Sequence, residues 1–221
     1  MDKMTLTNNL NLPGDIVQII LDELILNELK KEKINILSEE TGEVNFNESN
    51  LRFIVDPLDG TVNFIRDISQ CSVSIALYDG LIPIFGVLGI FPSFDIVWGM
   101  SKKYSYLNET KINVSSIKEL SKSIICSGFP SRFDYDDKIK LEEFFKLLKK
   151  FSKTRMLGSA AVSLFNVAKG SADYYFEKNI MIWDVAAGLS ILSGAGGCFE
   201  ISETKTKNML EVKASNGLLK V

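Results

Sequence analysis

The pattern of hydrophobic and polar residues in the first 40 positions predicts one helix followed by a short strand. Apolar residues recur at helical spacing among charges over residues 16–31, and two lysines close the segment, as is favourable at a helix C-terminus. Asp15 directly precedes this segment and has the side chain of an N-cap. Residues 34–37 then predict a strand that leads into two glutamates, Glu39 and Glu40.

The next segments predict a largely antiparallel sheet. Residues 53–55 form an apolar strand that we expect to end at Asp56-Pro57, because proline cannot donate a hydrogen bond to a sheet ladder. Further strands are predicted at residues 71–78, 81–91 and 94–98, the first two as a hairpin. No element is predicted in the polar stretch 99–121.

Beyond residue 115 the pattern changes to alternating strands and helices, which predicts an α/β arrangement with short connections. The chain is therefore expected to form two subdomains, residues 1–115 and residues 116–221. In the second, strands are predicted at 123–129, 154–157, 172–176 and 197–201, and helices at 136–151, from Ser159 to Lys169, and from Asp184 to 196.

Composition limits the chemistry that the chain can perform. Of the 221 residues 46% are hydrophobic and 24% are charged, and the net charge of −3 lacks the basic excess that nucleic-acid binding needs. The chain has no histidine, which excludes serine–histidine and cysteine–histidine catalysis and most transition-metal sites. Carboxylate oxygens are left as ligands, and these suit magnesium, calcium or manganese.

The sequence carries no sign of export or membrane insertion. Its first residues lack the apolar core of a signal peptide, and no apolar run reaches the ~18 residues of a membrane helix. Three cysteines form no CxxC pair and are expected to be reduced thiols. We therefore expect a cytoplasmic protein with neither a nucleic-acid nor a membrane partner.

The strongest local signal is DPLDGT at residues 56–61, directly after an apolar strand. Pro57 fixes φ and Gly60 permits backbone paths closed to other residues, so that the carboxylates of Asp56 and Asp59 can point at one spot. Two anions held close together favour a cation between them. An ordinary turn whose aspartates cap backbone amides explains the spacing equally well.

Other candidates are weaker when taken singly. The pair Glu39-Glu40 after the first predicted strand is, by itself, typical of a solvated turn. Asp184 lies in an apolar run, where it is either a helix N-cap or a metal ligand. Gly158 and Ser159 open a helix whose free N–H groups suit an anion. Arg132 and Arg155 are either phosphate-binding or surface arginines.

Taken in order, Glu39-Glu40, DPLDGT, GSAA (158–161) and WDVAAG (183–188) closely resemble the inositol monophosphatase family. That lithium-sensitive, Mg²⁺-dependent group includes fructose-1,6-bisphosphatases, nucleotide 3′-phosphatases and histidinol-phosphate phosphatases. The resemblance covers roughly residues 14–219. It implies a layered αβαβα sandwich of two subdomains, of the sugar-phosphatase type, and Mg²⁺-dependent hydrolysis of a small phosphomonoester by a metal-activated water.

The resemblance also implies roles for single residues. The metal ligands would be Glu39, Asp56, Asp59, Asp184 and the backbone carbonyl of Leu58. The catalytic residues would be Glu39, Asp59 and Thr61, with Glu39 and the Thr61 hydroxyl directing the attacking water. The substrate would contact Gly60, Thr61, Gly158, Ser159, Ala160, Glu177 and Asp184.

The resemblance leaves the substrate open. Members of the nucleotide branch favour lysine directly after the threonine of this motif, whereas Val62 follows Thr61 here. An inositol or sugar phosphate is therefore the preferred substrate, with a nucleotide 3′-phosphate or histidinol phosphate as alternatives. A binding or regulatory protein that retains the fold is the rival, although it would be expected to lack one of the ligands. Members of the family are commonly dimers. Residues 71–98 are also apolar at more positions than one buried sheet face requires, so we expect a homodimer.

Two features depart from the family pattern. Members usually carry two N-terminal helices, whereas only one is predicted here. In the family an aspartate supports the threonine that corresponds to Thr61, and either Asp15 or Asp22 would take that role.

Overall fold

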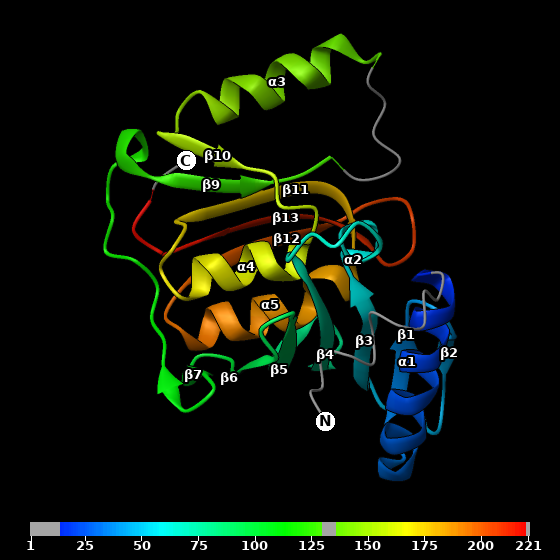
Figure 1. The fold of residues 1–221 in the computed structure, drawn as a ribbon. Helices are drawn as coiled ribbons and strands as arrows, with labels where there is room; N and C mark the ends of the chain where they lie inside the picture. The colour runs from blue at the N-terminus through cyan, green and yellow to red at the C-terminus, as the bar shows by residue number, and fades with distance from the viewer. Residues whose placement is uncertain (1–13, 130–135, 220–221) are drawn as a thin grey trace.

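The computed structural model describes residues 14–129 and 136–219, and these residues form five layers in the order helix, sheet, helix, sheet, helix (Figure 1). This is the predicted αβαβα sandwich. The three cysteines are free thiols, as predicted. None of the described helices is both long and apolar enough to cross a membrane.

The large sheet has eight strands in the order β2-β1-β3-β4-β5-β6-β7-β8. The strands are β1 (Asn35–Ser38), β2 (Gly42–Val44), β3 (Leu51–Asp59), β4 (Cys71–Asp79), β5 (Ile82–Phe91), β6 (Asp95–Met100), β7 (Tyr104–Leu107) and β8 (Thr110–Lys111). Neighbouring strands are antiparallel except β1 and β3, which are parallel. The C-terminal ends of β1 and β3 therefore meet at one edge of the sheet.

The small sheet has five strands in the order β10-β9-β11-β13-β12. The strands are β9 (Ile124–Ser127), β10 (Lys153–Arg155), β11 (Tyr174–Met181), β12 (Cys198–Glu203) and β13 (Met209–Ser215). Strand β9 is parallel to both of its neighbours, whereas β13 is antiparallel to β11 and to β12.

Two helices, α4 (Ala160–Ala168) and α5 (Ile182–Gly194), lie between the sheets and form the centre of the core. The main hydrophobic cluster joins residues from both sheets and both helices, among them Leu88, Leu164, Ile191 and Val212. Helix α5 approaches β5 at backbone distance, because a Cβ atom at Gly86 would lie 2.5 Å from the Ala187 carbonyl oxygen.

The other helices cover the outside. Helix α1 (Gly14–Leu29) packs through Leu26 on the outer face of β3, and a 3-10 turn (Lys30–Glu32) follows it. Helix α3 (Lys138–Leu148) covers the outer face of the small sheet through Phe144. The short helix α2 (Thr61–Ile65) follows β3, and a 3-10 turn (Leu120–Lys122) leads into β9.

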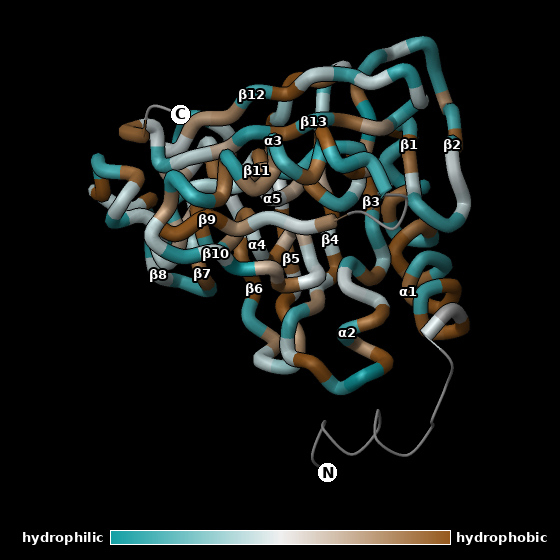
Figure 2. Tube along the Cα trace, turned by 90° about the horizontal axis from the view of Figure 1, so that it is seen from above, coloured by the Kyte–Doolittle hydropathy of each residue, from teal (hydrophilic) through white to brown (hydrophobic). Residues whose placement is uncertain are grey.

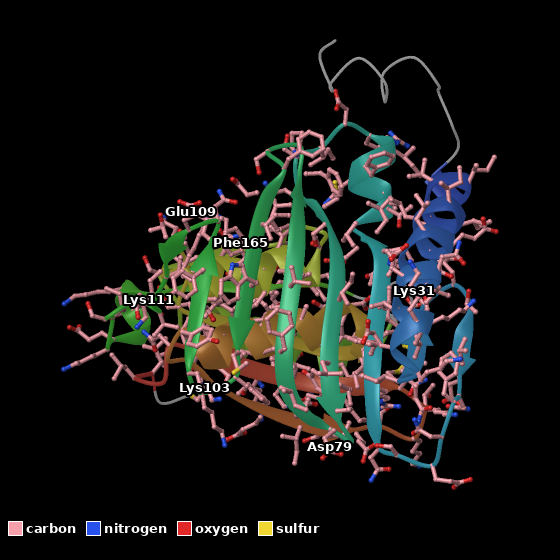
Figure 3. All side chains as sticks on the ribbon, turned by 90° about the horizontal axis from the view of Figure 1, so that it is seen from below. Lys31, Asp79, Lys103, Glu109, Lys111 and Phe165 are labelled. Carbon is pink, nitrogen blue, oxygen red and sulfur yellow. The ribbon has the colours of Figure 1, made fainter. Side chains whose placement is uncertain are left out.

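Much of the outer face of the large sheet is not covered by the described helices (Figure 3). Trp98 and Tyr106 stack there with ring centroids 4.9 Å apart, and Tyr104 lies edge-on to both. Hydrophobic residues recur along helix α1 at the edge of the molecule (Figure 2). Several of their side chains are exposed, including Leu24, which is 61% exposed.

No element was predicted in residues 99–121, which was wrong, because β7, β8 and the 3-10 turn before β9 lie there. Several predicted boundaries were wrong as well, three of them near the carboxylates. Strand β3 continues through Asp56-Pro57 to Asp59, because a register shift between Asp56 and Asp59 takes the proline out of the regular ladder. Helix α1 begins at Gly14, so Asp15 lies inside it and does not precede it. Helix α5 begins two residues before Asp184, since the Ile182 N–H bonds the Asn208 carbonyl at 2.8 Å.

Candidate active site

Parallel pairing of β1 with β3 places Glu39 beside Asp56. Ser38 is in register with Val55, and the next residue, Glu39, donates its N–H to the Val55 carbonyl at 3.1 Å. Two strand ends are thus held together by the backbone, and an acid follows each of them. Sheet geometry alone brings these two carboxylates close together.

Asp22 fixes the turn that carries Glu39. The hydroxyls of Ser38 and Thr41 donate to the two carboxylate oxygens of Asp22, which is buried in α1. Asp22 therefore supports the glutamate segment and does not contact Thr61. The side chain of the other predicted partner of Thr61, Asp15, lies outside the described residues.

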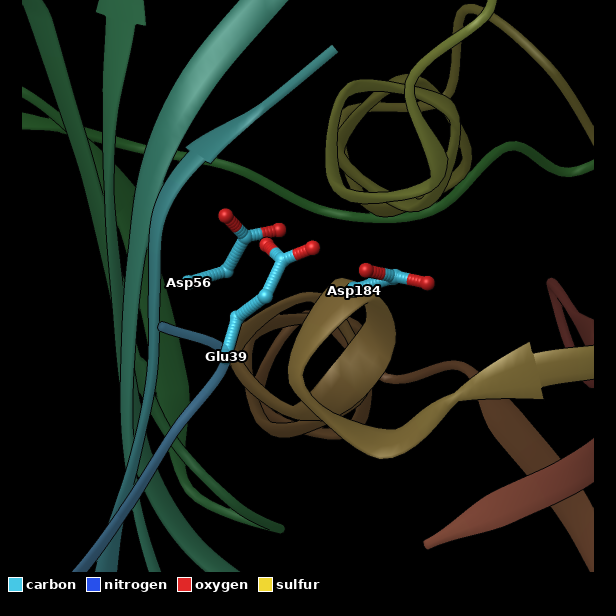
Figure 4. Close-up of side chains that lie close together, drawn as sticks. All are labelled: Glu39, Asp56 and Asp184. Atoms are coloured by element: carbon cyan, nitrogen blue, oxygen red, sulfur yellow. The ribbon is translucent and has the colours of Figure 1, made fainter. Parts of the chain in front are cut away.

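Asp184 enters the site from α5, where it is the third residue of the helix and accepts the Met181 N–H at 3.2 Å. One carboxylate oxygen from each of Glu39, Asp56 and Asp184 lies within 4.8 Å of the others (Figure 4). The carboxylates come from three elements, and the central helix closes the group against the sheet edge.

The irregular end of β3 is held by its own side chains. The Leu58 N–H donates to Asp56 Oδ1 at 2.9 Å, and the Thr61 hydroxyl donates to the Leu58 carbonyl at 3.0 Å. Gly60 has φ +83°, and a Cβ atom there would lie 2.7 Å from the Gln70 carbonyl oxygen. Only glycine fits this path without strain, and it turns the chain into α2.

Asp59 faces the start of α4. Its Oδ2 accepts the Ser159 hydroxyl and the Ala161 N–H, the latter at 2.9 Å, while Ser159 also accepts the Val162 N–H as the N-cap of the helix. Ser159 and Ala160 were predicted to contact substrate, and in this structure both form hydrogen bonds to the Asp59 carboxylate. Their contact with substrate stays a prediction.

The carboxylates destabilise one another's charge. Burial raises the pKa of Asp56 and of Asp184 well above the usual range, and the neighbouring charges of Asp59 and Glu39 raise both further. Burial also raises the pKa of Glu39, and that of Asp59 to about 6, although hydrogen bonds from Ser159 and Ala161 oppose the shift of Asp59. Such a cluster calls for a cation.

The donor set fits a hard divalent metal ion. Asp56 Oδ2 is buried and no N–H or hydroxyl of a described residue donates to it, although Oδ1 of the same carboxylate is satisfied. The Asp56 carboxylate lies beside a second acid, Glu39, with which it can share a hydrogen bond only when one of the two is protonated. An anionic oxygen in that state is costly unless a cation accepts it. The donors are oxygen atoms of Glu39, Asp56 and Asp184, which suit Mg²⁺, Mn²⁺ or Ca²⁺.

Glu177 lies in the wall of the same region. It is buried on β11, accepts the Tyr175 hydroxyl at 2.9 Å and lies against Gly128. Burial raises the pKa of Glu177 to about 7, the hydrogen bond from Tyr175 opposes this shift, and the nearby charge of Asp59 adds to it.

Sequence reasoning missed two residues of the site. The Asn63 side-chain amide donates to the carbonyls of Gln70 and Leu157, and so joins the loop after α2 to the residue before Gly158. A Cβ atom added at Gly158 would lie 3.0 Å from the Asn63 amide nitrogen. Tyr175 orients Glu177. Asn63 directly follows DPLDGT and Val62, and a search for polar residues at strand–helix turns would have found it.

Of the two arginine candidates, only Arg155 belongs to the described residues. It is exposed on β10 and donates to the Thr154 carbonyl at 3.0 Å, away from the carboxylate group. Arg132 lies outside the described residues, and its role stays a prediction.

Comparison with known proteins gives one consistent result. A profile described as "Inositol monophosphatase family" matches residues 13–216. The chain is 37% identical over 154 residues to an Aquifex aeolicus protein named fructose-1,6-bisphosphatase/inositol-1-monophosphatase, covering 69% of this chain and 58% of that one. It is 34% identical to a Xylella fastidiosa protein named Nus factor SuhB, over 82% of this chain and 66% of that one. The chain thus spans less than two thirds of either relative.

Solved structures agree with the fold. A SuhB structure from Bartonella henselae superposes with a TM-score of 0.81 at 31% identity, over 93% of this chain and 84% of that one. An inositol monophosphatase from Anabaena gives a TM-score of 0.79 at 30% identity, over 93% and 86%.

Proposed function

The chain belongs to the inositol monophosphatase family, and from that premise we propose that it hydrolyses a small phosphomonoester with Mg²⁺ as cofactor. The observation that carries the proposal is the convergence of Glu39, Asp56 and Asp184 to within 4.8 Å, with a buried Asp56 oxygen that lacks a partner. A cluster maintained at this electrostatic cost is typical of a functional site.

Glu39, Asp56 and Asp184 would hold the metal, and Asp59 and the Leu58 carbonyl would complete its ligands. When bound, Mg²⁺ supplies charge neutralisation to the phosphate and acidity to water. Thr61 is anchored on the Leu58 carbonyl, and with Glu39 it would orient the attacking water. The backbone N–H groups of Gly60 and Thr61 would bind the phosphate oxygens.

The remaining groups would bind the alcohol part of the substrate. Glu177 is buried, is oriented by Tyr175 and interacts with the charge of Asp59, so its carboxylate would accept a hydroxyl of the leaving group. Gly158, Ser159 and Ala160 would form the adjoining wall. An acceptor that selects hydroxyl groups favours an inositol or sugar phosphate over histidinol phosphate or a nucleotide 3′-phosphate.

The test is a phosphate-release screen with inositol 1-phosphate, fructose 1,6-bisphosphate, a nucleotide 3′-phosphate and histidinol phosphate. We expect turnover of a polyol phosphate with Mg²⁺, weaker turnover with Mn²⁺, and none after EDTA treatment. Restoration by added Mg²⁺ controls for damage by the chelator. Full turnover in EDTA would show that the metal proposal is wrong.

A second role is suggested by relatives named Nus factor SuhB, since a regulatory protein could keep this fold without turnover. The complete set of Glu39, Asp56, Asp59, Thr61 and Asp184 favours catalysis. Absence of release from all four substrates, with Mg²⁺ still bound, would favour the regulatory role.

A further inference from the structure

A polar cleft lies at the end of β3 opposite to the carboxylates. Two adjoining hollows of about 480 and 390 Å³ share Arg52, Leu81 and Glu203 as lining residues. Arg52 precedes Asp56 by four residues, which places their Cα atoms roughly 13 Å apart along the strand. The cleft is therefore separate from the carboxylate group and needs its own explanation.

The walls of the cleft come from both sheets. One hollow follows the start of β1 and β3 and the loop at residues 45–50, and the other lies under the turn between β12 and β13, residues 204–208. Lys207 of that turn forms a salt bridge with Glu43 of β2 at 2.6 Å and so joins the two sheets across the cleft.

The Arg52 guanidinium forms no hydrogen bond and no salt bridge with any described residue, although its charge acts on Glu43. The side chain is half-buried, and its Nε is shielded from solvent without a hydrogen bond. Over residues 14–129 and 136–219, no salt bridge or side-chain hydrogen bond includes Arg52. A buried donor in this state is unfavourable until an acceptor satisfies it.

The other charges of the cleft leave an excess of positive charge. Lys205 and Lys207 line it together with Arg52, against the two acids Glu43 and Glu203. The hydrogen bond and charge of Lys207, and to a smaller extent the charge of Arg52, lower the pKa of Glu43, which forms a salt bridge with Lys207. The three cations and two acids leave one positive charge in excess.

We propose that this cleft binds a small hydroxylated oxyanion, either a polyol phosphate or a hydroxycarboxylate, with its anionic head on Arg52. The planar guanidinium matches carboxylate and phosphate oxygens in a two-pronged geometry. Glu203 and Asn50 line the same cleft, and their oxygens can accept hydrogen bonds from the ligand's hydroxyl groups. The site does not depend on the hydrolytic activity proposed above.

The experiment follows the amide resonance of Gly80, which lines the cleft and donates to the Asn50 carbonyl at 3.1 Å. Inorganic phosphate, glycerate and glycerol are titrated separately into the full chain in Mg²⁺ buffer. We expect a saturable shift with phosphate, with glycerate, or with both, and none with glycerol. The anion that saturates identifies the head group. A shift with glycerol alone, or with neither anion, would overturn the proposal.

Matched variants assign the shift to the cleft. Arg52→Gln should weaken the binding of the anion by about tenfold or more, which is the effect of losing a charged hydrogen bond. Arg155→Gln makes the same charge change at an exposed arginine outside the cleft, and should leave the titration unchanged. Lys205→Gln should weaken the binding of the anion several-fold, and it provides the test if the Arg52→Gln variant does not fold. Unchanged affinity in both cleft variants would contradict the site.

Discussion

At the scale of single residues, the carboxylates of the candidate site are positioned without help from a ligand. Asp56 Oδ1 accepts the Leu58 N–H, Asp59 Oδ2 accepts Ser159 and Ala161, and Asp184 accepts the Met181 N–H. These three aspartates are thus anchored by the chain, and an Asp56 oxygen is left over. Such preorganisation lets a metal bind without rearranging its ligands.

Replacing Asp184 by Asn separates its role as a ligand from its role in the helix. Asparagine keeps an oxygen for the Met181 N–H, so helix capping should change by less than ~1 kcal/mol. It also removes one of several mutually repelling buried charges, so thermal unfolding in EDTA should occur at the wild-type temperature or above it. We expect kcat to fall at least ~10²-fold and half-maximal activity to need more Mg²⁺.

Thr61→Ala is the matched comparison. It removes the hydroxyl on the Leu58 carbonyl but no carboxylate. The rate should fall by about 10²–10⁴-fold, while the Mg²⁺ concentration for half-maximal activity stays at the wild-type value. If Asp184→Asn destabilises the protein yet its folded fraction turns over normally, Asp184 serves the helix and not the metal.

At the scale of elements, the site depends on how closely α5 packs against the large sheet. The closest approach is at Gly86 of β5, where an added Cβ would lie 2.5 Å from the Ala187 carbonyl oxygen and 2.8 Å from its Cα. Ala187 is three residues beyond Asp184, so this contact helps to fix the position of the ligand.

Gly86→Ala should therefore destabilise the protein by about 1–3 kcal/mol through overpacking. Gly89→Ala is the control on the same strand, because its Cβ would meet only the Ile96 side chain, at 3.9 Å. The control should be neutral or slightly stabilising. Urea unfolding of both variants measures the difference, and equal stabilities would show that α5 can move away from β5 without loss.

Several elements could be predicted from the sequence because their patterns are local. The helix 16–31, the hairpin 71–91 and the helix after Ser159 were all found, as was the αβαβα layering implied by the family resemblance. Strand β13 was missed, although it lies inside the small sheet, because Glu211 and Lys213 interrupt its apolar run. Helix α2 has five residues, which is too short for a period to show.

The candidate site was predictable in its members but not in its contacts. DPLDGT and WDVAAG identify Asp56, Asp59 and Asp184 from sequence alone. Ser159, which holds Asp59, lies a hundred residues later in the chain. This contact depends on the tertiary packing of α4 against β3, and no local sequence pattern indicates it. The division into two subdomains at residue 115 stays a prediction. Helix α5, which belongs to the second of them, packs on the large sheet of the first.

At the scale of the whole molecule, hydrophobic surface is left over. Trp98, Tyr104 and Tyr106 on the large sheet and Leu24 on α1 are only partly covered by the described residues. Exposed apolar side chains grouped on one face are typical of an interface.

We therefore expect a homodimer. Light scattering at micromolar concentration should give twice the chain mass of 24.7 kDa. Trp98→Arg, which places a charge in the aromatic group, should give the mass of one chain. A wild-type mass of one chain would contradict the dimer, and a dimer that survives Trp98→Arg would assign the interface to another surface.

The central position of α5 has a consequence for how the chain is made. The large sheet is complete at Lys111, but the helix that covers its inner face begins at Ile182. About 70 residues must be added in between, which takes roughly 4–14 s at ribosomal rates of about 5–20 residues per second. For that interval Leu88 and Val97, fully buried in the finished protein, have no helix against them. Until α5 emerges, in the last fifth of the chain, this apolar sheet face is open to aggregation.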